Sequence, residues 1–183
     1  MAPVRVGGQI AGSTSFTFVM KDITVARQKI TTFLWFDNQA EEAANFYVSL
    51  FKNSKVNRVT RNAEGGPGRA GSAMTVEFAL SGVEFIALNG GPHFKFTEAI
   101  SLSVDCESQA EIDELWEKLS EGGQKSRCGW LKDRYGLSWQ IVPSAISELM
   151  SGKEPTKTRR AMEAMMTMTK LDIQKLKAAY EAG

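Results

Sequence analysis

The chain has 183 residues, a length that suits one domain or two small modules sharing a core. Charged residues make up 23% and the formal net charge is +1, so the composition favours neither nucleic acid nor an acidic membrane surface as a partner. The longest apolar runs are too short to span a bilayer. The two cysteines are too few for a disulfide framework, so we expect reduced thiols and a cytoplasmic protein.

Residues 1–28 show no sustained hydrophobic period, because Gly, Ser and Thr interrupt short apolar pairs. They also lack the charged segment, apolar core and cleavage site of a secretory signal. We interpret them as a flexible or leader extension, with a short edge strand around Phe16–Met20 as the alternative.

Residues 29–89 open with Ile30–Phe36, a β-rich run. It ends at Asp37-Asn38, a pair that can cap a helix. A helix is predicted from about Ala40 to Phe51, because apolar residues recur at helical spacing. This stripe consists of Ala43, Phe46, Tyr47 and Leu50.

Three further strands are predicted in this part of the chain. Lys55–Arg61 is one, and Met74–Leu80 and Val83–Leu88 form a hairpin around Ser81-Gly82. The intervening loop, residues 62–71, satisfies the pattern G-x-G-x-x-G. A dinucleotide site needs a helix directly after such glycines, and here a strand follows, so we interpret them as part of a β-β loop.

Residues 90–97 are rich in turn-forming residues and are predicted to be a hinge. They contain His93, the single histidine, which excludes any zinc site needing two His ligands from one chain. His93 is the only candidate imidazole base, and the alternative is a structural histidine at the rim of a site.

Residues 98–143 repeat the order of elements in residues 29–89. Ile100–Val104 is a predicted strand, and Ser108 with Glu111 forms a capping box for a helix. The strands Ser126–Lys132 and Leu137–Val142 follow. The helix stripe has the spacing of the first one and consists of Ile112, Leu115, Trp116 and Leu119. Shared spacing across strand, cap and helix indicates an internal repeat.

Residues 144–183 form a tail with a different composition, for which we predict helices at Ala145–Met150, Thr156–Met168 and Leu171–Tyr180. A methionine stripe lies on the second of these helices. Its members are Met162, Met165 and Met166. Such a stripe is typical of packing in a core or between subunits, and the alternative is an adaptable surface for a protein partner.

The sequence therefore predicts an α+β fold of two βαβββ modules, residues 29–89 and 98–143, whose mixed sheet curls around a cleft, with C-terminal helices added. Candidate cleft residues combine aromatic rings with polar ends, and include Glu84 on a strand. Those chosen as ligand contacts are Trp35, Phe94, Trp130, Lys132, Trp139 and Gln140. Glu77 and His93 are the candidate catalytic bases. The alternatives are core positions for Trp35 and Trp139, and a surface pair of Lys132 with Asp133.

Four stretches, residues 34–51, 87–106, 128–143 and 162–176, resemble the PhnB-like family. This family lies in the vicinal oxygen chelate superfamily, with glyoxalase I, bleomycin-resistance proteins and extradiol dioxygenases. The resemblance covers about residues 30–176. It implies paired βαβββ modules and usually a homodimer, often with modules exchanged between subunits.

Members of the family are often labelled 3-demethylubiquinone-9 3-methyltransferase, which implies S-adenosylmethionine as a cofactor. The superfamily also places metal ligands at positions that fall here near Thr31, Ile86, Ala99 and Gln140, of which only Gln140 is a suitable ligand. Neither a divalent metal nor S-adenosylmethionine has support from the residues, so we predict no cofactor.

Three functions follow from this reading. The first is binding of a small, partly aromatic molecule in a cleft between the modules. The second is an enzyme, either a methyltransferase as the label says or a lyase or isomerase of the glyoxalase superfamily. The third is an interaction module that docks a partner through the methionine-rich tail.

Overall fold

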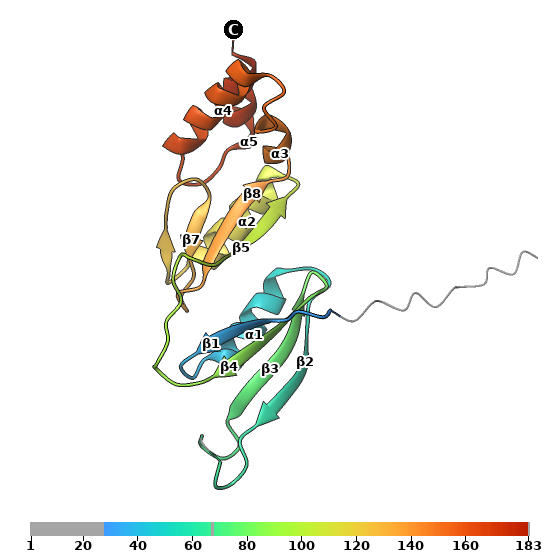
Figure 1. Ribbon diagram of the computed structural model, residues 1–183, viewed down its shortest axis with the longest axis vertical. Helices are drawn as coiled ribbons and strands as arrows, with labels where there is room; N and C mark the ends of the chain where they lie inside the picture. Colours follow the sequence, from blue (N-terminus) through green and yellow to red (C-terminus); the bar gives the residue numbers. More distant parts are fainter. Residues whose placement is uncertain (1–27, 67, 183) are drawn as a thin grey trace, which may run out of the picture.

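The computed structural model describes residues 28–66 and 68–182, and Figure 1 shows two α+β modules along the long axis with a helical tail at one end. The predicted leader, with the strand considered at Phe16–Met20, lies outside the described residues apart from Gln28. The side-chain amide of Gln28 accepts a hydrogen bond from the Glu84 N–H (3.0 Å) and donates one to the Glu84 carbonyl (3.1 Å).

Module one is a four-stranded sheet with one helix. Its elements are β1 (Thr32–Phe36), α1 (Ala40–Leu50), β2 (Lys55–Arg61), β3 (Ala73–Leu80) and β4 (Val83–Asn89). The strand order is β1-β4-β3-β2, with β1 parallel to β4 and the other pairs antiparallel. Alternation along β3 buries Val76 and Phe78 and turns Glu77 to the opposite face. Ser81 and Gly82 both have positive φ (48° and 83°), as a type I′ hairpin turn requires.

The start of α1 is capped from a distance, so the cap predicted at Asp37-Asn38 is wrong. The N-cap residue is Gln39, and its side chain makes no capping hydrogen bond. Asn89 instead accepts from the Ala40 N–H (2.8 Å) while its amide donates to the Ala73 carbonyl (2.9 Å). Parallel pairing of β1 with β4 brings Asn89 to this position, which no local sequence pattern reveals.

Module two repeats the arrangement. Its elements are β5 (Ser101–Cys106), α2 (Gln109–Ser120), β6 (Gln124–Lys125), β7 (Trp130–Lys132) and β8 (Ser138–Pro143), in the strand order β5-β8-β7-β6. Ser108 caps α2 as predicted, accepting from the Glu111 N–H (3.2 Å). The single strand predicted at Ser126–Lys132 is wrong in its first half, because Cys128 and Gly129 adopt positive φ (55° and 80°) and make a turn there.

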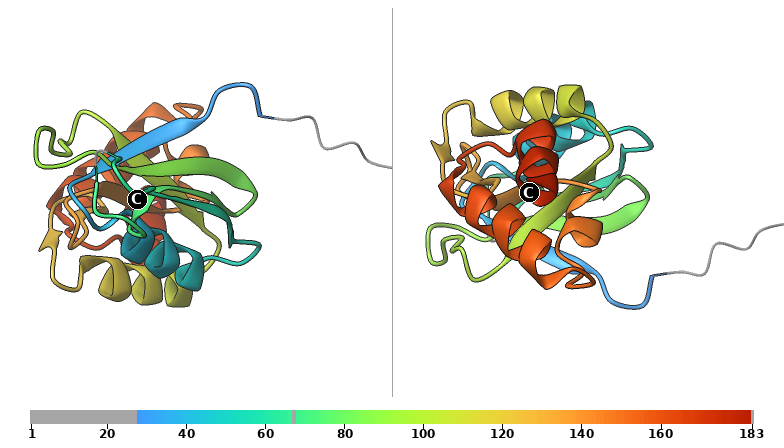
Figure 2. Two further views of the ribbon diagram at one scale, coloured as in Figure 1. Left: turned by 90° about the horizontal axis from the view of Figure 1, so that it is seen from below. Right: turned by 90° about the horizontal axis from the view of Figure 1, so that it is seen from above.

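The predicted α+β architecture of two βαβββ modules is confirmed, and the two mixed sheets remain separate within the chain. Figure 2 shows α1 and α2 on the same side of the molecule, so each covers one face of its own sheet. In the part of the chain that the structure describes, neither α1 nor α2 lies on the opposite face of its sheet, and we call that face the uncovered face.

One buried carboxylate joins the two modules. Asp133, between β7 and β8, is only 2% exposed. It accepts hydrogen bonds from the Tyr47 hydroxyl (2.7 Å), the Trp139 indole N–H (2.8 Å) and the backbone N–H groups of Tyr135 (2.8 Å) and Leu137 (3.0 Å). Because Tyr47 lies on α1, this network crosses from module two to module one.

Protonation states at this junction follow from burial. Desolvation, with the neighbouring Asp133 carboxylate, raises the pKa of Tyr47 well above its usual value, so the phenol remains a neutral donor. Desolvation also raises the pKa of Asp133, and the four hydrogen bonds act in the opposite direction. Aromatic rings surround the network: Phe51 stacks on Trp139 at 5.7 Å between centroids, and Phe36 meets Tyr135 edge-on at 6.1 Å.

The tail consists of α3 (Ile146–Leu149), α4 (Pro155–Thr167) and α5 (Ile173–Glu181). It has a small core of its own, to which Met165 contributes and from which Met162 and Met166 are largely exposed. The buried members of this core are Leu149, Ala161, Leu171 and Leu176. None of the helices in the described part of the chain is long and apolar enough to cross a membrane.

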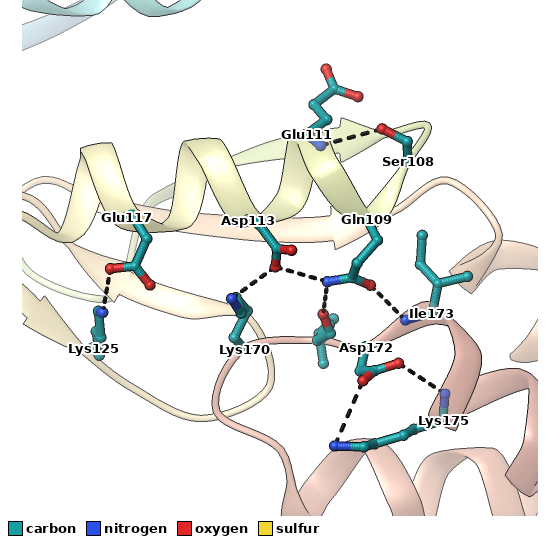
Figure 3. Close-up of polar contacts among 11 residues, drawn as sticks. Ser108, Gln109, Glu111, Asp113, Glu117, Lys125, Lys170, Asp172, Ile173 and Lys175 are labelled. Carbon is teal, nitrogen blue, oxygen red and sulfur yellow. Dashed lines mark hydrogen bonds and ion pairs between the residues drawn. The ribbon is translucent and has the colours of Figure 1, made fainter.

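Gln109, at the start of α2, connects the tail to module two (Figure 3). Its side-chain amide donates to the Leu171 carbonyl (3.2 Å) and accepts from the Ile173 N–H (2.9 Å). Beside it, Lys170 forms an ion pair with Asp113 (2.7 Å). The tail is therefore held by contacts that recognise its backbone as well as its side chains.

Replacing Asp133 by Ala should lower the free energy of unfolding by about 3 kcal/mol, because it leaves the buried donors of Tyr47 and Trp139 without an acceptor. Urea unfolding followed by circular dichroism measures the change. Tyr135→Phe is the matched control, because that hydroxyl bonds to Glu42 at an exposed position (2.8 Å). A smaller loss for Asp133→Ala than for Tyr135→Phe would contradict the role given to Asp133.

Candidate functional site

The uncovered face of the first sheet combines apolar and acidic side chains. Phe33 is 61% exposed, while the two acidic residues have partners within module one. Glu77, a candidate base, is ion-paired with Arg58, whose Nε donates at 3.0 Å. Glu84 accepts from the Asn57 amide at 3.2 Å.

Trp35 is positioned by the hinge. Its indole N–H donates to the Gly91 carbonyl (2.9 Å), and the Phe94 ring meets it edge-on at 4.9 Å. Gly90 lies against the indole, where a Cβ would stand 2.2 Å from the ring carbon Cζ2. The turn cluster that the sequence suggested therefore has a second role, because Gly90 provides the space for the Trp35 ring.

A hollow of about 270 Å³ lies beside the end of β1, between the two modules. Trp35 and Phe94 line it from module one and the hinge, and Lys132 and Tyr135 line it from module two. Three of the six predicted ligand contacts thus meet around one space. Tyr135 stays protonated, because burial and its hydrogen bond to Glu42 raise the pKa of the phenol.

Lys132 also borders a second hollow of about 180 Å³ on the uncovered face of the second sheet, together with Trp130 and Ser138. Its ion-pair partner is Glu98 of the hinge region, at 2.6 Å, and not the neighbouring Asp133. The bond to Lys132 lowers the pKa of the Glu98 carboxyl. Gln140, beside Trp130 in the sheet, donates to the Ser101 hydroxyl at 2.8 Å.

Trp139 lies on the helix side of its sheet and is 1% exposed. Its indole N–H belongs to the Asp133 network, and its ring borders a separate apolar hollow of about 400 Å³. That hollow also includes Phe51 and Val83 of module one. The structure therefore separates Trp139 from the other predicted contacts.

His93 is exposed on the hinge and does not line the hollow that contains Trp35. Glu77 lies on β3, paired with Arg58, and does not line that hollow either. The two candidate bases are therefore not among the residues that the structure gathers around this space.

The residues do not fit the metal or the methyl donor that the resemblance implies. Among residues 28–66 and 68–182, no three His, Cys, Asp or Glu side chains gather as a metal cluster. Ile86 and Ala99 have no side-chain donor atom, which leaves only Thr31 and Gln140, too few ligands for a site. The glycine-rich loop joins the antiparallel strands β2 and β3, so it presents no helix N-terminus to a ligand.

Sequence reasoning missed Glu98, Ser138 and Tyr135 as residues around the two hollows. Glu98 and Tyr135 lie in connecting segments, where side-chain direction follows no period. Ser138 is on the same parity as Gln140 along β8, a signal that could have placed it on the uncovered face.

Gly90→Ala should lower the free energy of unfolding by about 1–3 kcal/mol, because the added methyl overlaps the Trp35 indole. Urea unfolding followed by circular dichroism checks this. In a Trp35→Ala background the same change should cost less than about 0.5 kcal/mol, because the overlap is removed. Equal losses in both backgrounds would show that Gly90 is needed for another reason.

Comparison with known proteins gives a family and a fold. The family described as 3-demethylubiquinone-9 3-methyltransferase matches residues 28–142. A solved structure from Bacillus cereus, a "putative 3-demethylubiquinone-9 3-methyltransferase, PhnB protein", is 42% identical, covers 63% of this chain and 99% of its own, and has a TM-score of 0.60. No curated protein matches the chain.

A second solved structure, of a protein from Pseudomonas aeruginosa, is 20% identical. The alignment covers 63% of this chain and 97% of that one, with a TM-score of 0.53, which is a likeness of fold. The family match, the identity to the Bacillus cereus protein and the two βαβββ modules agree with one another. The chain belongs to the PhnB-like family whose description is 3-demethylubiquinone-9 3-methyltransferase.

Proposed function

We propose that this protein binds a small, partly aromatic molecule in the hollow between its two modules. The observation that supports this is the convergence of Trp35, Phe94 and Lys132 on one space of about 270 Å³. Ligand sites of small proteins are commonly apolar hollows between modules, with a few polar groups that fix orientation.

The arrangement assigns a role to each side chain. The rings of Trp35 and Phe94 offer a face and an edge to a planar ligand. Lys132 is 29% exposed at the other side of the hollow and provides a positive charge that orients the ligand. Tyr135 adds a further aromatic side chain to the lining, while its hydroxyl donates to Glu42 (2.8 Å).

We also propose that the protein forms a homodimer, in which a second copy covers the uncovered face of the first sheet. Phe33 on β1, in register with Ile86 of β4, is 61% exposed on the uncovered face of the first sheet. Large exposed apolar side chains on a sheet face without a helix are typical of a surface that another subunit covers.

Trp35→Ala and Phe94→Ala should each weaken binding of the planar probe 2-naphthamide by about tenfold, because each removes one aromatic contact. Isothermal titration calorimetry with the full chain measures this. Trp116→Phe, on the buried side of α2, is the control and should leave the affinity unchanged. Saturable binding of S-adenosylmethionine with none of 2-naphthamide would contradict the proposal and favour the methyl transfer named in the family description.

Phe33→Asp should convert the dimer to a monomer, because a charge on the uncovered face opposes its burial. Light scattering after size-exclusion chromatography gives the mass. Val83→Asp is the control, since Val83 is 49% exposed at the hairpin turn. A wild-type protein that is monomeric at all concentrations tested would rule out the dimer.

A further inference from the structure

Ser138 is a buried hydroxyl that has no hydrogen-bond partner among the described residues. It lies on β8 and is 0% exposed, although it belongs to the uncovered face of its sheet. A buried hydroxyl without a partner loses the hydrogen bonds that it makes with water, which destabilises the folded state. Such a group needs an explanation, and a ligand that supplies the missing partner is one.

The surroundings of Ser138 show what kind of partner fits. It lines the hollow of about 180 Å³ together with Lys132, Glu98 and Trp130. Ser138 and Lys132 are directly opposite each other on β8 and β7, so both side chains rise from the same face. Ser138 is 0% exposed, so its hydroxyl is closed to the hollow until a neighbouring side chain moves. Once it is reached, a hydroxyl and an ammonium on one face of the sheet can both donate to the oxygens of an acid.

The Lys132 ammonium is already paired with Glu98. Its carboxylate lies 2.6 Å from Lys132 Nζ, and Glu98 itself is 64% exposed at the end of the hinge. The pair therefore joins a largely exposed carboxylate to a partly buried ammonium. Water or a competing anion can replace the Glu98 carboxylate at little cost. The Glu98 carboxylate stands where the acidic group of a ligand would stand.

The rest of this hollow is compatible with an aromatic acid. Trp130 offers an indole on the adjacent strand, in register with Gln140. Lys132 borders both this hollow and the one that contains Trp35 and Phe94. Lys132 thus lies between the hollow lined by Trp35 and Phe94 and the hollow lined by Ser138.

We propose that Lys132 and Ser138 form a subsite for the carboxylate of an aromatic acid, and that Glu98 is a built-in competitor which leaves Lys132 when the ligand binds. The inference rests on the proposed function and names its ligand class. Lys132 Nζ and Ser138 Oγ donate to the two oxygens of the carboxylate, and the displaced Glu98 carboxylate returns to water. Binding therefore exchanges one ion pair for another and gives the Ser138 hydroxyl its missing partner.

The test compares 2-naphthoate with 2-naphthamide, which have the same ring and differ in charge, by calorimetry on the full chain. The wild type should prefer 2-naphthoate. Lys132→Met should abolish the preference, Ser138→Ala should reduce it about tenfold, and Glu98→Gln should increase 2-naphthoate affinity several-fold by removing the competitor. Each of these variants should change the affinity for 2-naphthamide less than it changes the affinity for 2-naphthoate. Lys55→Met, an exposed lysine on β2, is the matched charge control.

Thermal unfolding without ligand gives an independent readout. Ser138→Ala should raise the midpoint, because it removes a buried hydroxyl that has no partner. A merely structural hydroxyl, bonded in solution, would lower it instead. Ser138→Cys keeps a side chain of similar size with a weaker hydrogen-bond donor, so it controls for the effect of lost side-chain volume on the midpoint.

The subsite would be overturned if Ser138→Ala and Glu98→Gln both left the 2-naphthoate to 2-naphthamide ratio at the wild-type value. If 2-naphthamide still bound and depended on Trp35, the proposed function would stand while the subsite failed. If neither probe bound, the proposed function itself would fail. These outcomes separate the two proposals.

Discussion

The buried carboxylate of Asp133 determines how the two modules meet. Its four donors are two backbone N–H groups of its own turn, the indole of Trp139 and the hydroxyl of Tyr47, so no cation is needed to neutralise it. Burying a charge without such partners would cost several kcal/mol. The network therefore selects one orientation of α1 against module two. Lys132 precedes Asp133 in the chain, so the same turn also places the ammonium at the module junction.

The candidate site lies at the places where the repeat leaves edges and linkers. Among the strands that the structure describes, β1 pairs with β4 alone. The end of β1, at Trp35 and Phe36, lines the first hollow together with residues of the hinge and of module two. Gly90 admits the Trp35 ring, and the hinge then returns over the second sheet, where Glu98 meets Lys132. The connection from Gly90 to Glu98 thus borders both hollows, through Phe94 in the first and Glu98 in the second.

Much of the fold follows from period and spacing. The two helix stripes, the Ser81-Gly82 hairpin and the Ser108 cap are local features, and local physics decides them. The long-range cap of α1 by Asn89 and the turn at Cys128 depend on tertiary contacts, so a local pattern misplaced both. In the site, parity along β8 predicts that Trp139 and Gln140 lie on opposite faces of the sheet. The contact between Glu98 and Lys132 depends on the path of the hinge, which no local pattern predicts.

The attachment of the tail has a consequence for the order of folding. The tail reaches module two through the Gln109 amide and through the turn at Cys128 and Gly129, whose N–H groups donate to the carbonyls of Met168 and Thr169 (both 2.8 Å). These partners exist as a surface only after α2 and the β6–β7 turn have formed. The tail therefore docks on a surface that module two must form first, so its docking follows the folding of that module.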